Sequence, residues 1–440
     1  MAVGQREFPQ RDAIIVGGGY GALSAALALH RVGISSLVLE KSPAARQEGF
    51  SIGAWSNAWR ALEELGVADA VRKGHIAQNR VQFADSDQNV YKELRIQELP
   101  PPEGMDINEF RVIRRMAVPS AISDALPKDT IHYGCKILRA TVTPTGAEVE
   151  LEGGQKLTAK LVILGDGVHS KSAAKYHKMP LRVMDIVGWR AIVEVDCEDE
   201  SQAATISNGP NVRTGTVPVS YDPERKKMLW YYFVAAAMKA EDVKKYNTPQ
   251  QHKDGMLSYL KGWSAPRIKA LIAQTPSETI LLSHIYERQV EAGKPWFEGC
   301  LTGVGDCAHA TRPDLGQGGA MAIEDGVELG VYIREAMEEA EKPFGKMNPE
   351  QISAALRKYE IARSHRVAHI VGKSGKIGSM FMLMGYLPKF VMRFILSMLL
   401  QPATFLEHTL WAPHGKLCQP DSHRMNSAAH HPTNGAVAAT

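Results

Sequence analysis

The stretch AIIVGGGYGA, residues 13–22, joins a short apolar run to a glycine-rich turn. Residues 13–16 predict a buried strand, and the spacing of apolar residues after the turn predicts a helix. Gly33 ends that helix, and residues 36–39 predict a second apolar strand that closes at Glu40. The order strand, helix, strand is typical of two parallel strands joined by a crossover helix, so the sequence predicts an α/β fold.

Small residues stand in this stretch where a nucleotide-binding turn needs them. Gly17 allows the tight turn, Gly19 lets the backbone approach a pyrophosphate, and Ala22 lets helix and strand pack closely. The phosphates would then lie at the positive end of the helix. Glu40 is placed to accept hydrogen bonds from the ribose of an adenosine, which favours FAD or NAD over NADP. The stretch therefore predicts a dinucleotide site, with an ordinary glycine turn as the alternative.

A second glycine motif, GVGDCA, occupies residues 303–308. It lacks the acidic-ended strand of a second nucleotide fold and runs instead into ATRPDLGQGG, residues 310–319, before a helix. The glycines on both sides of Gln317 make a backbone loop that can contact a flat ring or a phosphate. Asp306, at a strand end, can accept a hydrogen bond from a sugar-chain hydroxyl.

Composition excludes several classes of partner and site. The 440 residues hold 51 Lys+Arg against 48 Asp+Glu, a net charge of +3, which offers no broad basic face for nucleic acid. Small molecules are therefore the expected partners. The five cysteines form no CxxC pair, which favours a reduced compartment and no zinc site. An apolar strand begins at residue 13, too early to follow a signal peptide, so a cytoplasmic protein is expected.

The rest of the chain changes character along its length. Residues 130–166 predict alternating strands, and residues 184–284, rich in β-branched and aromatic types, predict a second, mostly antiparallel sheet. The composition becomes helical after residue 324. In the Met-rich run 380–400, Gly385 and charged residues interrupt the apolar pattern. We interpret this run as two helices packed on the protein, with a monotopic membrane contact as the alternative.

Three motifs stand in the order found in a known family. The opening turn, LGDGVHS at 164–170, and GD at 305–306 followed by PDLGQGG at 313–319 resemble the three fingerprints of the single-component FAD-dependent monooxygenases. That group includes para-hydroxybenzoate hydroxylase, salicylate hydroxylase and zeaxanthin epoxidase. Residues 57–66 and 109–115 are most similar to plant salicylate-hydroxylase-like and zeaxanthin-epoxidase-like members.

The resemblance implies a Rossmann-like FAD-binding domain with an inserted, mostly antiparallel β-sheet substrate domain and a C-terminal helical segment. Residues 418–440 carry almost no large apolar side chains that could be buried, so they are expected to be disordered. The expected division is 1–80, 105–183 and 285–348 for the FAD-binding domain, 81–104 and 184–284 for the substrate domain, 349–417 for the C-terminal helices, and 418–440 for the tail.

The resemblance also implies roles for individual residues. Glu40 would hold the FAD ribose, and Arg46 and Arg115 would lie near the phosphates or the ribityl chain, where a planar guanidinium can donate hydrogen bonds in pairs. Asp306 would bind the ribityl or phosphate region, and Asp166 belongs to a motif linked to both FAD and NAD(P)H. The implied cofactor-binding residues are Gly17, Gly19, Ala22, Glu40, Arg46, Arg115, Asp166, Asp306, Gly316, Gln317, Gly318 and Gly319.

The reaction implied by the resemblance consumes NAD(P)H and dioxygen. The nicotinamide reduces the flavin, dioxygen forms a flavin hydroperoxide, and its terminal oxygen hydroxylates or epoxidises a small aromatic or isoprenoid compound. Arg190 matches an arginine used near substrate or flavin, so it is the predicted catalytic residue. Arg213, Thr216, Trp230 and Tyr232 are further pocket candidates. Ordinary sheet packing or surface charge is the alternative for all of them.

Some positions depart from the family pattern. Ala173 replaces the arginine that closes the middle motif, where Lys171 or Lys175 could substitute, and Val217 replaces a tyrosine of many aromatic hydroxylases. His309 is expected to be a structural part of its motif. These departures leave two alternatives open: a flavin-fold binding or escort protein that does not turn over, and an oxidase or reductase on the same scaffold.

Overall fold

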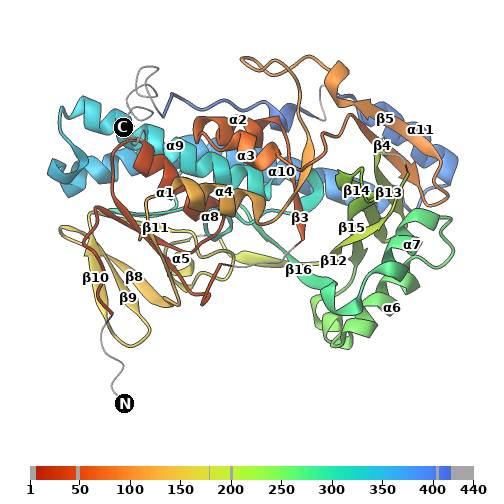
Figure 1. Cartoon of the computed structure of the whole chain (residues 1–440), viewed down its shortest axis with the longest axis horizontal. Coiled ribbons are helices and arrows are strands. Elements are labelled where there is room, and N and C mark those ends of the chain that lie inside the picture. Colours follow the sequence, from red (N-terminus) through yellow and green to blue (C-terminus); the bar gives the residue numbers. More distant parts are fainter. Residues whose placement is uncertain (1–5, 46–49, 178, 199–201, 403–405, 418–440) are drawn as a thin grey trace, which may run out of the picture.

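The computed structural model describes residues 6–45, 50–177, 179–198, 202–402 and 406–417. Arg46 and the tail 418–440 lie outside these ranges, so the predictions made for them stay predictions. Figure 1 shows two large sheets toward opposite ends of the molecule, with long helices beside them. None of the helices in the described ranges carries an apolar stretch long enough to cross a bilayer.

A five-stranded parallel sheet contains the opening motif. Helix α1 (Tyr20–Arg31) joins β1 to β2, which confirms the predicted crossover unit. The GVGDCA motif begins no second nucleotide fold, because its strand β17 pairs with β11 in this same sheet. In spatial order the strands are β17 (Leu301–Gly303), β11 (Leu161–Leu164), β1 (Ala13–Val16), β2 (Ser36–Glu40) and β7 (Ile131–Tyr133).

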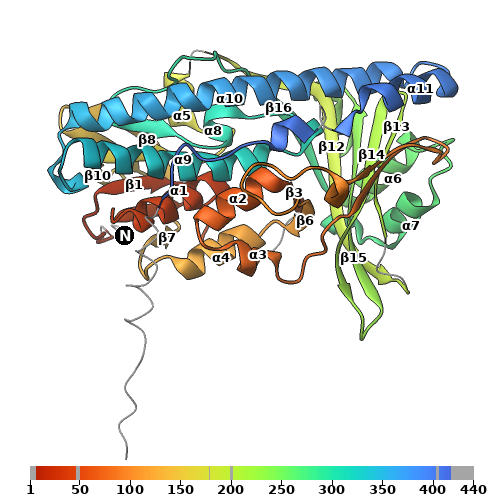
Figure 2. The ribbon, with the colours of Figure 1, turned by 90° about the horizontal axis from the view of Figure 1, so that it is seen from above.

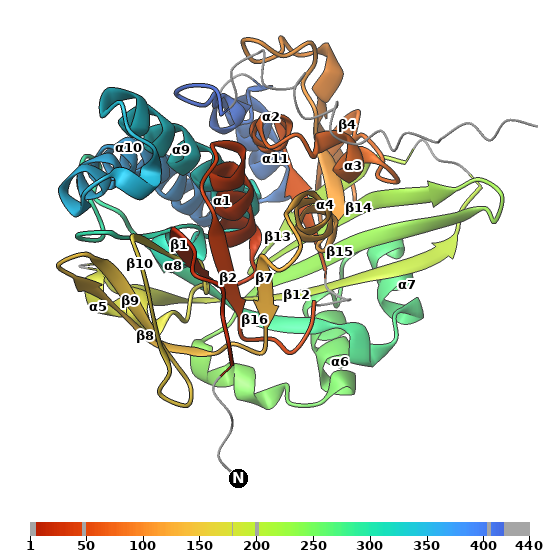
Figure 3. The ribbon, with the colours of Figure 1, turned by 60° about the vertical axis from the view of Figure 1, so that its left-hand side comes forward.

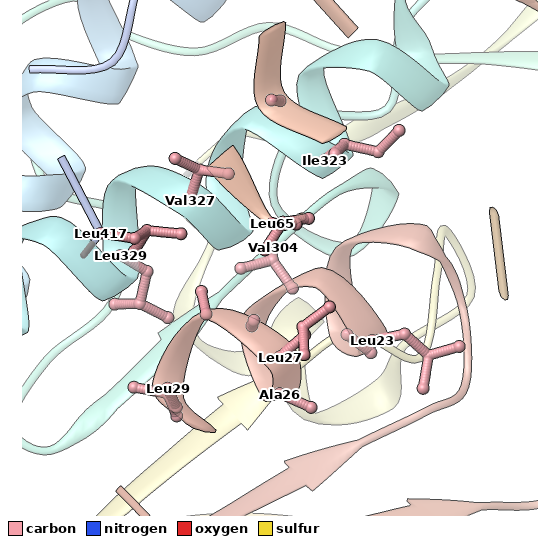
Figure 4. Close-up of a cluster of buried hydrophobic side chains, with 14 of the residues drawn as sticks. Leu23, Ala26, Leu27, Leu29, Leu65, Val304, Ile323, Val327, Leu329 and Leu417 are labelled. Atoms are coloured by element: carbon pink, nitrogen blue, oxygen red, sulfur yellow. The ribbon is translucent and has the colours of Figure 1, made fainter. Parts of the chain in front are cut away.

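Helix α9 (Gly318–Glu339) packs on α1 and fixes the starts of both helices (Figure 4). Leu27 of α1 and Val327 of α9 are fully buried in this contact. A Cβ atom at Gly326 would lie 2.5 Å from the backbone of Ala25, so only glycine allows this approach. Because both helices begin in glycine motifs, their packing sets the distance between the two motifs.

The second large sheet has seven strands and is mostly antiparallel, as predicted; only β13 and β4 pair in parallel. Helices α6 (Pro249–Tyr259) and α7 (Pro266–Gln274) lie on one side of it (Figure 3). In spatial order the strands are β16 (Leu281–Arg288), β12 (Leu181–Asp196), β15 (Lys227–Ala237), β14 (Val212–Asp222), β13 (Ala204–Gly209), β4 (Arg80–Asp85) and β5 (Val90–Arg95).

Smaller elements connect these sheets. The predicted strands between residues 130 and 166 include a three-stranded antiparallel sheet, and β3 pairs with β6 between the two large sheets. These elements are β8 (Ile137–Thr143), β9 (Gly146–Leu151), β10 (Lys156–Ala159), β3 (Ser51–Ala54), β6 (Arg111–Arg114), α2 (Ser56–Glu64), α3 (Ala68–Arg72), α4 (Ala117–Ala125), α5 (Lys171–Tyr176) and α8 (Asp306–His309), with short 3-10 turns η1 (Ile96–Glu98), η2 (Ala240–Lys245), η3 (Ser277–Thr279), η4 (Pro313–Leu315), η5 (Phe344–Lys346) and η6 (Glu407–Thr409).

Helix α10 (Pro349–Met384) runs along the molecule from the parallel sheet to the seven-stranded sheet, where α11 (Lys389–Leu399) lies beside it (Figure 2). Asn348 caps α10 by accepting a hydrogen bond from the Gln351 amide at 2.9 Å. The two helices predicted for 380–400 are confirmed. Phe381 and Leu396 are buried against the seven-stranded sheet, on the side opposite α6 and α7.

Candidate active site

The turns that carry the three sequence motifs meet at one edge of the parallel sheet. Gly17 follows β1, Asp166 follows β11, Asp306 follows β17, and Glu40 ends β2. In open α/β sheets, ligands bind outside the carboxyl ends of the strands, where connections leave toward opposite sides. Segments nearly 300 residues apart in the sequence, Gly17 and Asp306, therefore contribute to one edge.

The first glycine turn is shaped by backbone contact as well as by conformation. Gly17 has φ +103°, and a Cβ atom there would lie 2.5 Å from the Gly165 carbonyl oxygen. Gly165 in turn lies against Ala22, which explains the small third residue of the motif. At Gly19 the nearest atom to a Cβ is 3.8 Å away, so the protein itself leaves room there. The free space at Gly19, at the start of α1, fits a phosphate held by backbone amides.

Glu40 is fixed beside this turn by two backbone hydrogen bonds. Its Oε2 atom accepts from the Gly18 amide at 2.6 Å, and its Oε1 atom accepts from the Ser42 amide at 2.8 Å. Each carboxylate oxygen keeps a second lone pair. The carboxylate is therefore oriented, and it retains capacity to accept from the hydroxyls of a ribose.

Asp306 brings the second motif to the same region. Its side chain is exposed to solvent, yet surrounding protein raises the pKa of this carboxyl, while the charges of His309 and Arg115 act to lower it. A carboxylate that is accessible to solvent and yet surrounded by protein lies in a recess of the surface. The charge of Arg190 also acts on Asp306, so Arg115, Arg190 and Asp306 lie within electrostatic reach of one another.

Phe50 joins the two predicted arginines. The Cζ atoms of Arg115 and Arg190 lie 4.7 Å and 4.3 Å from the centroid of its ring, distances typical of cation–π contacts. Arg190 also donates to the hydroxyl of Ser283 on β16. The Tyr20 hydroxyl donates to the Arg115 carbonyl oxygen at 2.5 Å, which ties the end of β6 to the start of α1. Sequence reasoning missed Phe50 because a single aromatic residue carries no motif.

The loop at residues 316–319 leads into the start of α9. Gly316 closes η4 with φ +63°, a left-handed conformation that favours glycine, and Gly318 and Gly319 form the first turn of α9. A Cβ atom at Gly316 would lie 3.5 Å from Trp55 Nε1. The loop thus presents backbone rather than side chains, as contact with a flat ring requires.

Gln317 connects this loop to a buried network of charges. It is buried; its Oε1 atom accepts from Asn57 Nδ2 at 2.8 Å, while its Nε2 atom has no partner among the described residues. Asn57 Nδ2 also donates to Glu324 at 2.5 Å. Burial opposes the ionisation of Glu324, but Arg366 and Arg363 hold its pKa below the ordinary value. A buried donor without a partner next to the glycine loop suits a polar edge of a bound cofactor.

His309 has a structural place, as expected. It is buried, and its Nε2 atom lies 2.6 Å from Asp325 Oδ2, which also accepts from the Gly305 amide at 2.7 Å. Burial opposes the ionisation of Asp325, while His309 and Arg363 hold its pKa below the ordinary value. This pair therefore fixes the turn that carries Asp306.

The middle motif contributes one carboxylate and no arginine. Burial raises the pKa of Asp166, and its Oδ1 atom has no partner among the described residues. Ala173 is fully buried, and its amide donates to Ser170 Oγ at 3.0 Å. An arginine at this position would have to enter the core, whereas Lys171 is exposed at the start of α5.

The two faces of the seven-stranded sheet separate the predicted pocket residues. Arg190 pairs with Phe233 in register and lies on the face toward α10, as does Arg213. The other pocket candidates, Thr216, Trp230 and Tyr232, do not share this face with Arg190. Trp230 and Tyr232 are buried against α6 and α7, and Thr216 pairs with Tyr232 on their side. Side chains along a strand alternate between the two faces of the sheet. The face of each residue therefore depends on the register of its strand, which could not be read from the sequence.

Tyr231 is a pocket candidate that the sequence did not reveal. It pairs with Val217 on the face of Arg190, so a tyrosine lies beside the position where Val217 replaces one. Burial raises the pKa of Tyr231, and the charge of Arg190 lowers it. Apolar residues cover the same face, among them Trp55, whose ring stacks on Phe110 with 3.9 Å between centroids.

These observations fit FAD. The space at Gly19, the oriented carboxylate of Glu40 and the recessed carboxylate of Asp306 suit a pyrophosphate, a ribose and a ribityl chain in turn. The half-buried glycine backbone at residues 316–319 suits a flavin ring. Arg46, predicted near the phosphates, lies outside the described residues.

Comparisons with known proteins agree with this interpretation. Residues 10–346 match the model of a family described as the FAD binding domain. Aurachin C monooxygenase/isomerase of Stigmatella aurantiaca is 28% identical over 382 residues, which cover 83% of this chain and 88% of the relative. FAD-dependent urate hydroxylase of Klebsiella pneumoniae is 27% identical over 374 residues, with 83% and 88% covered. Zeaxanthin epoxidase of Solanum lycopersicum is 30% identical over 388 residues, which cover 84% of this chain and 55% of that protein.

The fold is shared with solved structures. The structure of Klebsiella pneumoniae HpxO with FAD and uric acid has a TM-score of 0.75 and 24% identity, and the match covers 92% of this chain and 97% of that one. The family match extends over most of the chain and includes the glycine turn, the Asp166 motif and residues 303–319. The chain therefore belongs to the FAD-binding-domain family and is an FAD-dependent monooxygenase.

Proposed function

We propose that this monooxygenase uses NADH or NADPH and dioxygen to hydroxylate or epoxidise a small aromatic or isoprenoid compound. The observation that carries the proposal is the contact of Arg115 and Arg190 with one ring, Phe50. This contact joins the part of the molecule that carries the parallel sheet to the apolar face of the seven-stranded sheet. Bound FAD supplies the redox chemistry that links the nicotinamide to dioxygen.

The chain's own residues would hold the cofactor along the edge of the parallel sheet. The turn with Gly17 and Gly19 would receive the pyrophosphate, Glu40 the adenosine ribose, and Asp306 the ribityl chain. The backbone of residues 316–319 would lie against the flavin ring. Asn57 supports this loop by holding Gln317 through a buried hydrogen bond.

Arg190 and Tyr231 would face the substrate. Arg190 is kept in place by Ser283 and Phe50, so its charge is oriented before a substrate arrives. The apolar cluster that includes Trp55, Leu315 and Phe381 would exclude water around the reacting atoms and favour an apolar compound. The relatives are named for urate, aurachin C and zeaxanthin, which supports a small flat or isoprenoid substrate.

The nicotinamide would bind transiently. The described residues form one parallel sheet with a nucleotide-binding turn, and that turn fits FAD. Lys171, exposed at the start of α5 beside the Asp166 motif, is the basic side chain we assign to the reductant in place of the arginine missing at Ala173.

The test is oxygen transfer from labelled dioxygen. The FAD-loaded protein is incubated with NADH or NADPH, ¹⁸O₂ and a panel of phenols, benzoates and terpenoids. The proposal predicts that one compound accelerates NAD(P)H oxidation and gains one labelled oxygen atom. NAD(P)H oxidation without label in any product would instead indicate a reductase or oxidase, and no NAD(P)H oxidation would indicate a binding or escort protein.

A further inference from the structure

The end of α10, the turn after it and helix α11 carry a ridge of exposed apolar side chains. These elements lie at the end of the molecule that holds the seven-stranded sheet (Figure 2). Phe390, Phe394 and Met398 follow one another at intervals of four residues, which places them on one face of α11. An exposed patch of this kind marks an interaction surface. The apolar ridge consists of Leu383, Tyr386, Phe390, Phe394, Met398 and Leu399, each 53–70% exposed.

The apolar ridge is fixed to the protein from behind. On the opposite face of α11, Leu396 is fully buried in the cluster on the seven-stranded sheet. Lys389 Nζ lies 2.5 Å from Asp87 Oδ2, and Arg393 Nη1 lies 3.5 Å from Asp85 Oδ2. The opposite face of α11 is therefore packed on the protein. The two basic side chains of this helix are already paired with Asp87 and Asp85.

Residues 418–440 are a poor cover for the apolar ridge. Residues 418–440 are mostly Ser, Ala, His, Asn and Pro, and their large aliphatic side chains are Met425 and Val437. These two side chains cannot match an array of two phenylalanines, a tyrosine, a methionine and two leucines.

A second copy of the chain is also a poor cover. A helix as long as the whole ridge, residues 383–399, would be about 26 Å long and about 10 Å wide, so its footprint would be about 260 Å². A stable protein interface needs about 800 Å² on each partner. The apolar ridge is several times too small to hold a dimer together, whereas a fluid apolar phase needs no matching surface.

We propose that the apolar ridge docks the protein onto the surface of a lipid bilayer. Phe390 and Phe394 enter the acyl-chain boundary, and Tyr386, with an apolar ring and a polar hydroxyl, lies at headgroup level. Because Lys389 and Arg393 are paired with Asp87 and Asp85, apolar insertion rather than charge supplies the binding energy. Docking therefore depends little on anionic lipid or on salt.

Docking would place lipid next to the candidate pocket. The buried face of α11 belongs to the same apolar cluster as Trp55 and Tyr231, which lie on the side of Arg190. A bilayer-dissolved compound could then reach the pocket along α11. This consequence rests on the proposed function, whereas the docking itself requires no turnover.

The test is flotation of the FAD-loaded full chain with phosphatidylcholine vesicles in a density gradient. We compare wild type, the double variant Phe390→Ser/Phe394→Ser, and the control Ile107→Ser/Leu138→Ser, which removes two exposed apolar side chains elsewhere. Wild type and control are expected to float with the vesicles. The ridge variant is expected to bind about a hundredfold more weakly, about tenfold for each phenylalanine, with unchanged flavin content.

Salt and lipid charge complete the experiment. Adding phosphatidylglycerol or raising the salt concentration is expected to change wild-type binding less than about threefold. Failure of wild type to float, or equal flotation of the ridge variant, would overturn the proposal. Binding that appears only with anionic lipid and disappears in salt would overturn it too, as would a wild-type dimer that the ridge variant converts to monomer without any vesicle binding. A wild-type protein that floats normally but shows no monooxygenase activity would count against the proposed function and not against the docking.

Discussion

The guanidinium carbon of Arg190 lies 4.3 Å from the centroid of the Phe50 ring. Arg115 contacts the same ring at 4.7 Å, and the charges of both arginines act on Asp306. Arg190 of the seven-stranded sheet and Arg115, which follows β6, thus meet at one aromatic ring. This relationship places the proposed chemistry at the junction of the two large sheets.

Replacing Arg190 should separate flavin binding from turnover. Arg190→Ala is expected to keep its FAD but to lose about 10- to 100-fold in turnover, because a charged hydrogen-bond donor contributes about 1.5–3 kcal/mol. Arg190→Lys should recover part of the rate. The control is Arg182→Ala, an exposed arginine on the same strand. Turnover at the wild-type rate in Arg190→Ala would leave Arg190 as a sheet-packing residue.

Two glycines of the first turn should respond differently to alanine. In Gly17→Ala the new Cβ lies 2.5 Å from Gly165 and φ is positive, so the melting temperature of the FAD-free protein should fall. In Gly19→Ala the nearest atom among the described residues, apart from the adjoining backbone, is the Gly165 carbonyl oxygen at 3.8 Å. The melting temperature should therefore be unchanged, while FAD affinity falls at least about tenfold. Thermal melting and FAD titration measure both effects. Wild-type FAD affinity in Gly19→Ala would show that no phosphate approaches this turn.

The two carboxylates that frame the site should each contribute to FAD retention. Glu40→Ala and Asp306→Ala each remove a charged acceptor, so each is expected to weaken FAD binding about 10- to 100-fold. Glu278→Ala, an exposed acid in the other half of the molecule, serves as the control. Flavin content after gel filtration reports the effect, and normal content in both variants would refute the two assignments.

Glu360 should make stability depend on pH. Burial raises its pKa to about 7 from an ordinary 4.5, although Arg357 at 3.0 Å and the Thr302 hydroxyl at 2.7 Å favour the charged form. Between these two values the folded chain holds a proton that the unfolded chain has released. The free energy of unfolding should therefore fall by about 3 kcal/mol as the pH rises from 4.5 through 7.

Glu360→Gln isolates this contribution. The amide cannot ionise and keeps an oxygen that can accept from the Trp296 amide, which donates to Glu360 at 3.1 Å. Denaturant unfolding across the pH range should show a smaller slope in the variant than in the wild type. Identical slopes in the two proteins would mean that Glu360 is ionised in the folded chain at neutral pH.

The nucleotide half of the molecule could be predicted from sequence in some detail, and the substrate half only in outline. Gly17 and Glu40 belong to a local motif whose spacing determines its geometry, so their neighbourhood followed from residues 13–40 alone. Trp230 and Tyr232 could be named as pocket candidates but not placed on a face, because strand register depends on long-range pairing. Tyr231 lies between these two residues in the sequence, so its side chain is on the opposite face of the sheet, the face of Arg190.

Phe50 could not have been found from the sequence for a different reason. Its contacts with Arg115 and Arg190 join the residue after β6 to β12, and these are far apart in the chain. No period or motif in one sequence encodes such a meeting. The role of His309 could be inferred, because its motif places it on the turn that carries Asp306.

Three separated motifs are expected to form one FAD site, and titration of the FAD-free protein with FAD is the decisive measurement. We expect saturation at one FAD per chain, visible flavin absorbance that survives gel filtration, and at least about tenfold weaker binding in Gly19→Ala without loss of folding. A folded protein that stays colourless and shows no saturable FAD binding would refute the FAD site.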